Sequence, residues 1–176
     1  MGFTVAILTV SDRCSRSEEQ DRTGPQIAAW VREHWQAEVI AQTIVPDERP
    51  QIAGQLRAWS KTGADLILTT GGTGFSPRDV TPEATQDVIE RDAPGLAEAM
   101  RAEGLAETPH AILSRARAGI CGRTLIINLP GSPKGARSGL ETLEKALPHG
   151  IAMLQGVQEA YPDDGAMKRK SKNPES

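Results

Sequence analysis

The stretch Ala64–Ala84 constrains the fold of this chain more than any other part of the sequence. It begins with the apolar run Leu66-Ile67-Leu68, which is typical of a strand covered on both faces. Three glycines and three threonines make up Thr69–Gly74, so backbone amides there can face a ligand without an intervening Cβ. Thr81-Pro82-Glu83 then predicts the start of a helix, with Thr81 as its N-cap residue. This order of strand, glycine loop and helix N-terminus suits a phosphate ester with a divalent cation.

Strands and amphipathic helices alternate on both sides of this stretch. Strands are predicted at residues 3–10 and 38–45, and apolar residues at helical spacing follow each of them. Two strand-like runs flank Cys121-Gly122, which predicts a β-hairpin and one antiparallel strand. The alternation therefore predicts an α/β fold, a mostly parallel sheet with helices on both faces. The buried faces of the first two helices are predicted to carry Ile27, Trp30, Val31 and Trp35, and then Ile52, Leu56 and Trp59.

The second half of the chain predicts three more helices. Asp92–Gly95 interrupts the chain, and the helix after it is expected to end near Thr108-Pro109. A short helix is expected at about residues 148–155. We expect a single domain over residues 1–157 and a disordered basic tail over residues 158–176, where little can be buried. The apolar residues that mark the other two helices are Leu96, Met100 and Leu105, and then Leu140, Leu143 and Leu147.

Composition restricts the class of protein. The 176 residues suit one domain with a core of its own, and no apolar run approaches the roughly 20 residues of a membrane-spanning helix. Met1–Val10 has no basic start and reads as a strand, not as a signal peptide. Cys14 and Cys121 show no metal-ligand spacing, which favours reduced thiols and a cytoplasmic location. A net charge of −3 gives no global basic field, so nucleic acid is not expected as a partner.

Four polar loops are predicted to meet at one edge of the sheet. In a parallel α/β sheet, the ligand crevice lies beyond the C-terminal ends of the strands. Ser11-Asp12, Asp47, Gly71–Gly74 with Asp79, and Gly131-Ser132 all follow predicted strands. The P-loop motif, the GxGxxG motif after the first strand and the GxSxG nucleophile motif are absent from the sequence. The loops thus predict a ligand site that differs from a P-loop NTPase, a common dehydrogenase or a serine hydrolase.

Asp47 and Asp79 are the carboxylates most suited to catalysis at this edge. Each follows a predicted strand beside turn-forming residues, where a carboxylate can hold the Mg²⁺ that phosphoryl or nucleotidyl transfer needs. The alternative is that both are ordinary turn or capping residues. Arg78 and Lys134 are candidate phosphate clamps, against the alternative of solvated surface cations. Ser76 and Ser132 could donate hydrogen bonds to a ligand or serve only in turns.

Taken together, the motifs resemble one family: the molybdopterin adenylyltransferases and molybdopterin-binding proteins of molybdenum cofactor biosynthesis. The matching segments occur in order over about Val5 to Gln155, and the TTGGTG and SPRDVTPEAT motifs are the most specific. The segments are Thr9–Asp12, Val45–Glu48, Thr69–Gly74, Ser76–Thr85, Leu113–Arg115 and Asn128–Lys134.

The resemblance implies a three-layer α/β/α fold, a homotrimer and an enzyme that uses Mg-ATP to adenylylate molybdopterin. Pyrophosphate would leave, and a metal-insertion protein of the same pathway would receive the product. Asp47 and Asp79 match the family's catalytic carboxylates, which are expected to act through Mg²⁺, while Glu83 matches without an assignable role. The alternative function is a molybdopterin-binding or carrier protein without catalysis.

Further site residues follow from the same resemblance, combined with the loop positions. Nucleotide and phosphate groups are expected to bind at Ser11, Asp12, Thr70, Gly71, Gly72, Thr73, Gly74 and Arg78. The pterin substrate is expected to bind at Ser76, Ser114, Gly131, Ser132 and Lys134.

Overall fold

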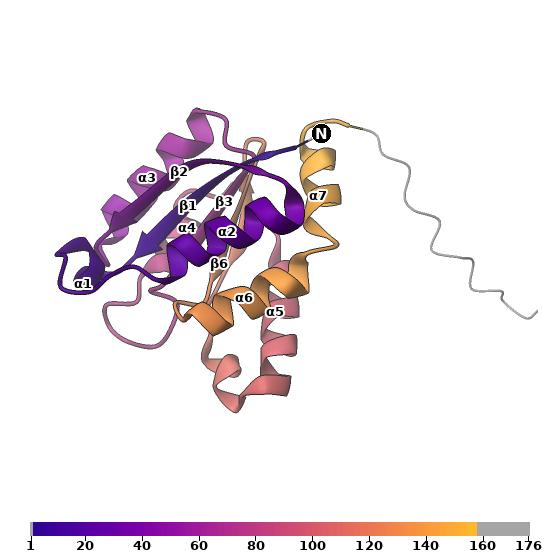
Figure 1. The fold of residues 1–176 in the computed structure, drawn as a ribbon. Coiled ribbons are helices and arrows are strands. Elements are labelled where there is room, and N and C mark those ends of the chain that lie inside the picture. Colours follow the sequence, from indigo (N-terminus) through magenta and orange to yellow (C-terminus); the bar gives the residue numbers. More distant parts are fainter. Residues whose placement is uncertain (1, 158–176) are drawn as a thin grey trace, which may run out of the picture.

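A six-stranded sheet forms the centre of the molecule in a computed structural model that describes residues 2–157 (Figure 1). The strand order is β2-β1-β3-β6-β5-β4. β1, β2, β3 and β6 are parallel, whereas β5 is antiparallel to both β6 and β4. The predicted α/β class, with a mostly parallel sheet and an antiparallel hairpin strand, is therefore confirmed. The strands are β1 (Thr4–Val10), β2 (Glu38–Val45), β3 (Leu66–Thr70), β4 (Arg91–Asp92), β5 (Ala118–Cys121) and β6 (Thr124–Leu129).

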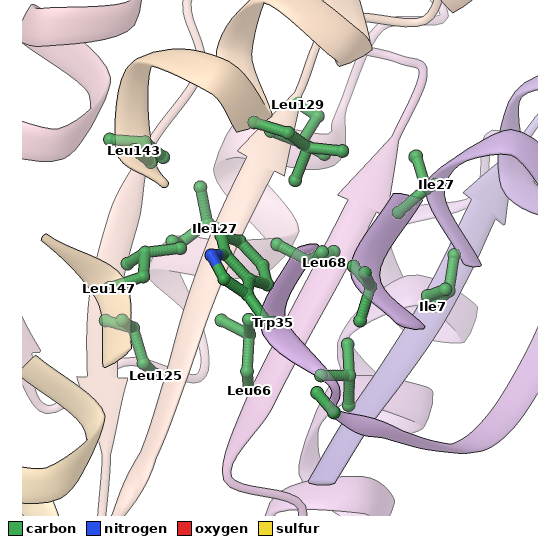
Figure 2. Close-up of a cluster of buried hydrophobic side chains, with 14 of the residues drawn as sticks. Ile7, Ile27, Trp35, Leu66, Leu68, Leu125, Ile127, Leu129, Leu143 and Leu147 are labelled. Carbon is green, nitrogen blue, oxygen red and sulfur yellow. The ribbon is translucent and has the colours of Figure 1, made fainter. Parts of the chain in front are cut away.

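Helices cover both faces of the sheet and make the three layers that were expected. One buried cluster joins the sheet to α2, α5, α6 and α7, and a second joins the opposite face to α3 and α4. Figure 2 shows the first cluster, in which Trp35 lies among Leu66, Leu68 and Ile127 of the central strands. The helices are α1 (Asp12–Ser15), α2 (Thr23–Trp35), α3 (Arg49–Lys61), α4 (Thr81–Gln86), α5 (Pro94–Glu107), the 3₁₀ helix η1 (Pro109–Leu113), α6 (Pro133–Leu143) and α7 (Leu147–Leu154).

The burial of the strands explains why the central apolar runs are continuous. Every residue of β3 and β6 is buried, as both faces of an inner parallel strand must be when helices cover them. β2 lies at the edge of the sheet, and its residues alternate between exposed and partly buried positions up to Val45. The sequence pattern thus reflects the position of each strand in the sheet.

Three local predictions were wrong. Thr81 is the first residue of α4 and not its N-cap, because its hydroxyl donates to the Gly71 carbonyl at 2.9 Å. The hairpin turns one residue later than predicted, since Cys121 pairs with Thr124 and Gly122, at φ +58°, takes the first turn position. Leu147 begins α7 and does not continue the preceding helix.

Three short elements, β4, α1 and η1, were not predicted, and one prediction falls outside the described residues. β4 adds two residues beside β5, and the Ser11-Asp12 loop turns into α1 with Ser11 as its N-cap. The expected tail over residues 158–176 lies outside the described part of the chain. Within residues 2–157, no helix combines the length and the apolar character needed to cross a bilayer.

Candidate functional site

The glycine loop after β3 packs directly against the end of β1. Gly71 has φ +98°, and a Cβ at this position would lie 2.2 Å from the Val10 carbonyl oxygen. Gly72 has φ +62°, and a Cβ there would lie 3.0 Å from Asp47 Oδ1. Only glycine fits both the backbone conformation and the available space. The loop therefore brings its backbone close to the ends of β1 and β2, where the first two acidic loops begin.

Asp12 and Asp47 hold the ends of β1 and β2 together. The Asp12 amide donates to Asp47 Oδ2 at 2.8 Å, and the Asp47 amide donates to Asp12 Oδ1 at 3.1 Å. This reciprocal pair arises because β1 and β2 are parallel neighbours whose C-terminal ends lie side by side. It fixes both carboxylates at the same edge of the sheet, as the sequence predicted.

Arg78 connects this edge to the loop that follows β3. Its guanidinium donates to both carboxylate oxygens of Asp12 at 3.0 Å, and also to Glu48 at 2.9 Å. The predicted phosphate clamp is thus paired with two carboxylates of the protein. These contacts place Arg78 directly beside the Asp12–Asp47 pair.

Asp79 lies at the other side of the glycine loop. Its Oδ2 accepts a hydrogen bond from the Ser76 amide at 3.0 Å, and its own amide donates to the Ser76 carbonyl at 2.9 Å. A Cβ on Gly74 would lie 2.9 Å from Asp79 Oδ2. Because Asp47 faces Gly72 and Asp79 faces Gly74, both predicted catalytic carboxylates lie against the same short loop.

The two carboxylates at the ends of β1 and β2 differ in their electrostatics. The hydrogen bonds from Arg78 hold the pKa of Asp12 below its ordinary value. Burial raises the pKa of Asp47, and repulsion from Asp12 and Asp79 adds to the effect. A carboxylate that is partly desolvated and close to other acids attracts a cation, which would relieve the repulsion.

A pocket of about 360 Å³ opens beside the glycine loop, between α5, η1 and α6. Thr73 and Gly74 line this pocket. They also separate it from the acidic side of the site, by which we mean Asp12, Asp47 and Asp79. Of the predicted substrate residues, Ser114, Gly131, Ser132 and Lys134 line this pocket, whereas Ser76 lies on the acidic loop. The structure therefore divides the predicted residues into an acidic side and a pocket side that meet at Thr73 and Gly74.

Several of the predicted polar side chains have partners within the protein. Ser132 caps α6 by accepting the Gly135 amide, and Ser11 caps α1 by accepting the Cys14 amide. Thr70 is buried, and its hydroxyl donates to the Pro130 carbonyl at 2.7 Å, which joins the ends of β3 and β6. Lys134 forms an ion pair of 2.8 Å with Glu107, which raises the pKa of the lysine.

Four charged or ionisable residues of the pocket and of its link to the acidic side were not predicted from the sequence. Arg101, Glu107 and His110 line the pocket from α5 and η1. Arg115 follows Ser114 and contacts the glycine loop, Asp79 and Glu83. No sequence pattern marked Arg101, Glu107 or His110, whereas Arg115 stands inside the Leu113–Arg115 segment and could have been identified there.

The donor set suits a hard divalent cation only in part. Within residues 2–157, no group of three or more His, Cys, Asp or Glu side chains could hold a metal ion by itself. Asp47 and Asp79 nevertheless offer the oxygen ligands that Mg²⁺ prefers, and Mg²⁺ commonly takes one or two carboxylates together with substrate phosphates. The residues therefore fit Mg²⁺ that takes its remaining oxygen ligands from a bound phosphate group.

Comparisons with known proteins show which family this chain is similar to. A family model described as "Probable molybdopterin binding domain" matches residues 6–149. The chain is 40% identical over 154 residues to a molybdopterin adenylyltransferase of Helicobacter pylori, covering 86% of this chain and 88% of the relative. It is also 40% identical over 170 residues to the molybdenum cofactor synthesis protein cinnamon of Drosophila melanogaster, but it spans only 27% of that protein's length.

A solved structure of the molybdopterin biosynthesis enzyme MoaB from Thermus thermophilus matches with a TM-score of 0.83 and 54% identity. The match covers 88% of this chain and 97% of the Thermus chain, so the likeness extends over nearly the whole described fold. The chain therefore belongs to the molybdopterin-binding domain family of molybdenum cofactor biosynthesis proteins.

Proposed function

We propose that this protein is a molybdopterin adenylyltransferase, which transfers the adenylyl group of ATP to the terminal phosphate of molybdopterin. The observation that carries the proposal is the placement of Asp47 and Asp79 against one glycine loop whose other wall is a pocket of about 360 Å³. Two reactants must meet for such a transfer, and the two sides of the site meet at Thr73 and Gly74. The activity of the Helicobacter relative, as its name states it, supports the same reaction.

Each side of the site suits one substrate. The pocket offers the Ser114 and Ser132 hydroxyls and the apolar Met100 side chain, a mixture suited to a pterin ring with polar edges. The glycine loop offers backbone amides to phosphates, since Gly71 and Gly72 leave no side chain in the way. Molybdopterin would therefore present its phosphate at the wall where the triphosphate of ATP would bind.

The reaction is a nucleophilic displacement at phosphorus. An oxygen of the pterin phosphate forms a bond to the α-phosphorus of ATP, the bond between that phosphorus and the bridging oxygen breaks, and pyrophosphate leaves. Asp47 and Asp79 would hold Mg²⁺, which neutralises charge on the triphosphate when it is bound. The protein itself holds the two substrates in the orientation that the reaction needs. It does so against the repulsion between their anionic groups.

Arg78 has to exchange partners if it contacts phosphate. In the structure it forms ion pairs with Asp12 and Glu48, and 54% of its side chain is exposed to solvent. A phosphate group accepts the same forked pattern of hydrogen bonds that Asp12 accepts now. Arg78 would then release the Asp12 carboxylate as the nucleotide binds.

We further propose a homotrimer in the cytoplasm that passes its product to the metal-insertion protein of the pathway. The support for these points is the family resemblance and the presence of two free cysteines among the described residues. Light scattering on the purified protein gives its mass directly. A mass of one or two chains would refute the trimer.

The activity is tested by incubating the protein with molybdopterin and Mg-ATP and separating the products by chromatography. We expect adenylylated pterin from the wild type, and a loss of about 10²-fold or more in turnover for Asp79→Asn and Asp47→Asn, with pterin binding kept. Asp65→Asn is a matched control, because Asp65 bonds Thr4 at the opposite end of β3. Tight pterin binding without product would refute the transferase and favour the carrier protein.

A further inference from the structure

We propose that Arg115, neutralised by Glu83, is a positioning residue that holds the loop carrying Asp79 in its reactive place. The inference rests on the proposed transferase. It gives a role to Glu83, for which the family resemblance implied none. Arg115 is 33% and Glu83 39% exposed at the side chain, so the pair is partly enclosed. Neither residue lines the pocket beside the glycine loop.

Arg115 bonds both ends of the Gly74–Asp79 loop. Its Nε donates to the Gly74 carbonyl at 2.7 Å, and its Nη2 donates to the Asp79 carbonyl. Its backbone amide donates to the Thr73 carbonyl at 2.9 Å. Arg115 therefore bonds three backbone carbonyl groups. They lie at the two ends of the segment that carries Ser76 and Arg78.

Glu83 supplies the charge that allows a guanidinium to lie at this place. Its Oε1 accepts from Arg115 Nη1, and Glu83 belongs to α4, which begins two residues after Asp79. Glu83 Oε2 is enclosed and has no hydrogen-bond partner among the described residues. The arginine is therefore the main compensation for this carboxylate, and removal of either partner leaves an uncompensated charge.

The same arginine connects the two sides of the site. Arg115 follows Ser114, which lines the pocket, and Arg101 of α5 donates to the carbonyls on both sides of it, those of Ser114 and Ala116. The backbone at residues 114–116 is thus fixed from the pocket side by Arg101. Arg115 extends from this fixed point to the loop of Asp79. The pocket wall and the Asp79 carboxylate therefore keep fixed positions relative to each other.

Lysine cannot replace arginine here. The planar guanidinium donates in several fixed directions at once, whereas the lysine ammonium is a single point at the end of a flexible chain. Arg115→Lys keeps the charge beside Glu83 but cannot bridge the Gly74 and Asp79 carbonyls in the same way. It should therefore loosen the loop without removing the electrostatic compensation.

The first test is a double-mutant cycle on turnover with molybdopterin and Mg-ATP. We expect Arg115→Lys to lower kcat about 10- to 100-fold, because a displacement of about 1 Å costs that much, and to change pterin affinity less than about threefold. In an Asp79→Asn background, the same change should lower kcat less than about threefold further. Losses that multiply in full would mean that Arg115 does not act through Asp79, and would overturn the proposal.

The second test needs no activity. Hydrogen exchange at the amides of Ser76 and Asp79, which bond within the loop, should be at least about tenfold faster in Arg115→Lys, while β3 and β6 keep wild-type exchange. Unchanged exchange at these two amides would overturn the proposal. Uniformly faster exchange across the sheet would also overturn it, because Arg115 would then serve only the stability of the whole fold.

Arg49→Ala is the matched control. Arg49, the first residue of α3, forms a 2.7 Å ion pair with Asp87, the residue that follows α4, so the variant removes an arginine that contacts the opposite end of α4 from Glu83. It should leave kcat and the exchange at Ser76 and Asp79 unchanged. Absence of product from the wild type would refute the transferase alone, since the exchange experiment still decides the role of Arg115.

Discussion

Gly71→Ala tests how closely the glycine loop approaches β1. The substitution places a Cβ 2.2 Å from the Val10 carbonyl oxygen, at a residue with φ +98°. The left-handed backbone costs about 1–2 kcal/mol for a residue with a side chain, and the overpacking against backbone about 1–3 kcal/mol. The free energy of unfolding should therefore fall by about 2–5 kcal/mol.

Gly122→Ala provides the comparison that separates these two contributions. Gly122 has φ +58°, but nothing lies within 4 Å of a Cβ at this position. It should lose only the backbone contribution of about 1–2 kcal/mol. Urea unfolding of both variants at one protein concentration gives the two values. Equal losses would refute the reasoning, because they would mean that the loop does not press on Val10 as the geometry indicates.

Three further predictions concern the carboxylates and the core. Gly74→Ala should lower kcat about 10-fold with little change in the urea midpoint, since the added Cβ meets only Asp79 Oδ2 at 2.9 Å. Asp47→Asn should raise the urea midpoint at pH 7, because the raised pKa of Asp47 means that its ionised form destabilises the fold. Asn128→Ala should lower the free energy of unfolding by about 3 kcal/mol, since its buried amide bonds Thr69, Thr85 and the Arg117 amide.

The sign of the Asp47 prediction can be checked by varying the pH. A carboxyl with a raised pKa in the folded state contributes stability when protonated, and this contribution is lost as the pH rises through that pKa. The difference between Asp47→Asn and the wild type should therefore shrink at acid pH. A lower midpoint for the variant at pH 7 would contradict the burial of Asp47. Unchanged kcat in Gly74→Ala, or an Asn128→Ala loss below 1 kcal/mol, would contradict the other two.

The sequence predicted the helix and sheet layers because the helical spacing of apolar residues and the apolar runs of the strands are both clear. Helices α2 and α3 bury the apolar residues that their spacing indicated, and β3 is as fully buried as its continuous apolar run implies. The errors are local. Thr81 resembles an N-cap in sequence, but the tertiary contact with the Gly71 carbonyl uses its hydroxyl. Similarly, the helical pattern at Leu140, Leu143 and Leu147 does not show that the chain bends between α6 and α7.

Reasoning from the loops predicted the candidate site where it follows strand ends, and Ser114, which follows η1, was predicted only from the family resemblance. Asp47 and Asp79 were found because a parallel sheet brings its C-terminal strand ends together. The pocket wall from α5 and η1 could not be predicted, since it depends on how those helices pack. Nor could the sequence show that Arg78 and Lys134 are paired with Asp12 and Glu107, because these partners are far away along the chain.

The most direct measurement of the central claim follows the phosphorus atoms of ATP. The protein is incubated with molybdopterin, Mg²⁺ and ATP labelled at either the α- or the γ-phosphate, and the label in the pterin fraction is counted. An adenylyltransferase transfers the α-label to the pterin and releases the γ-label as pyrophosphate. Label from the γ-phosphate on the pterin, or no label from either, would contradict the function proposed for this site.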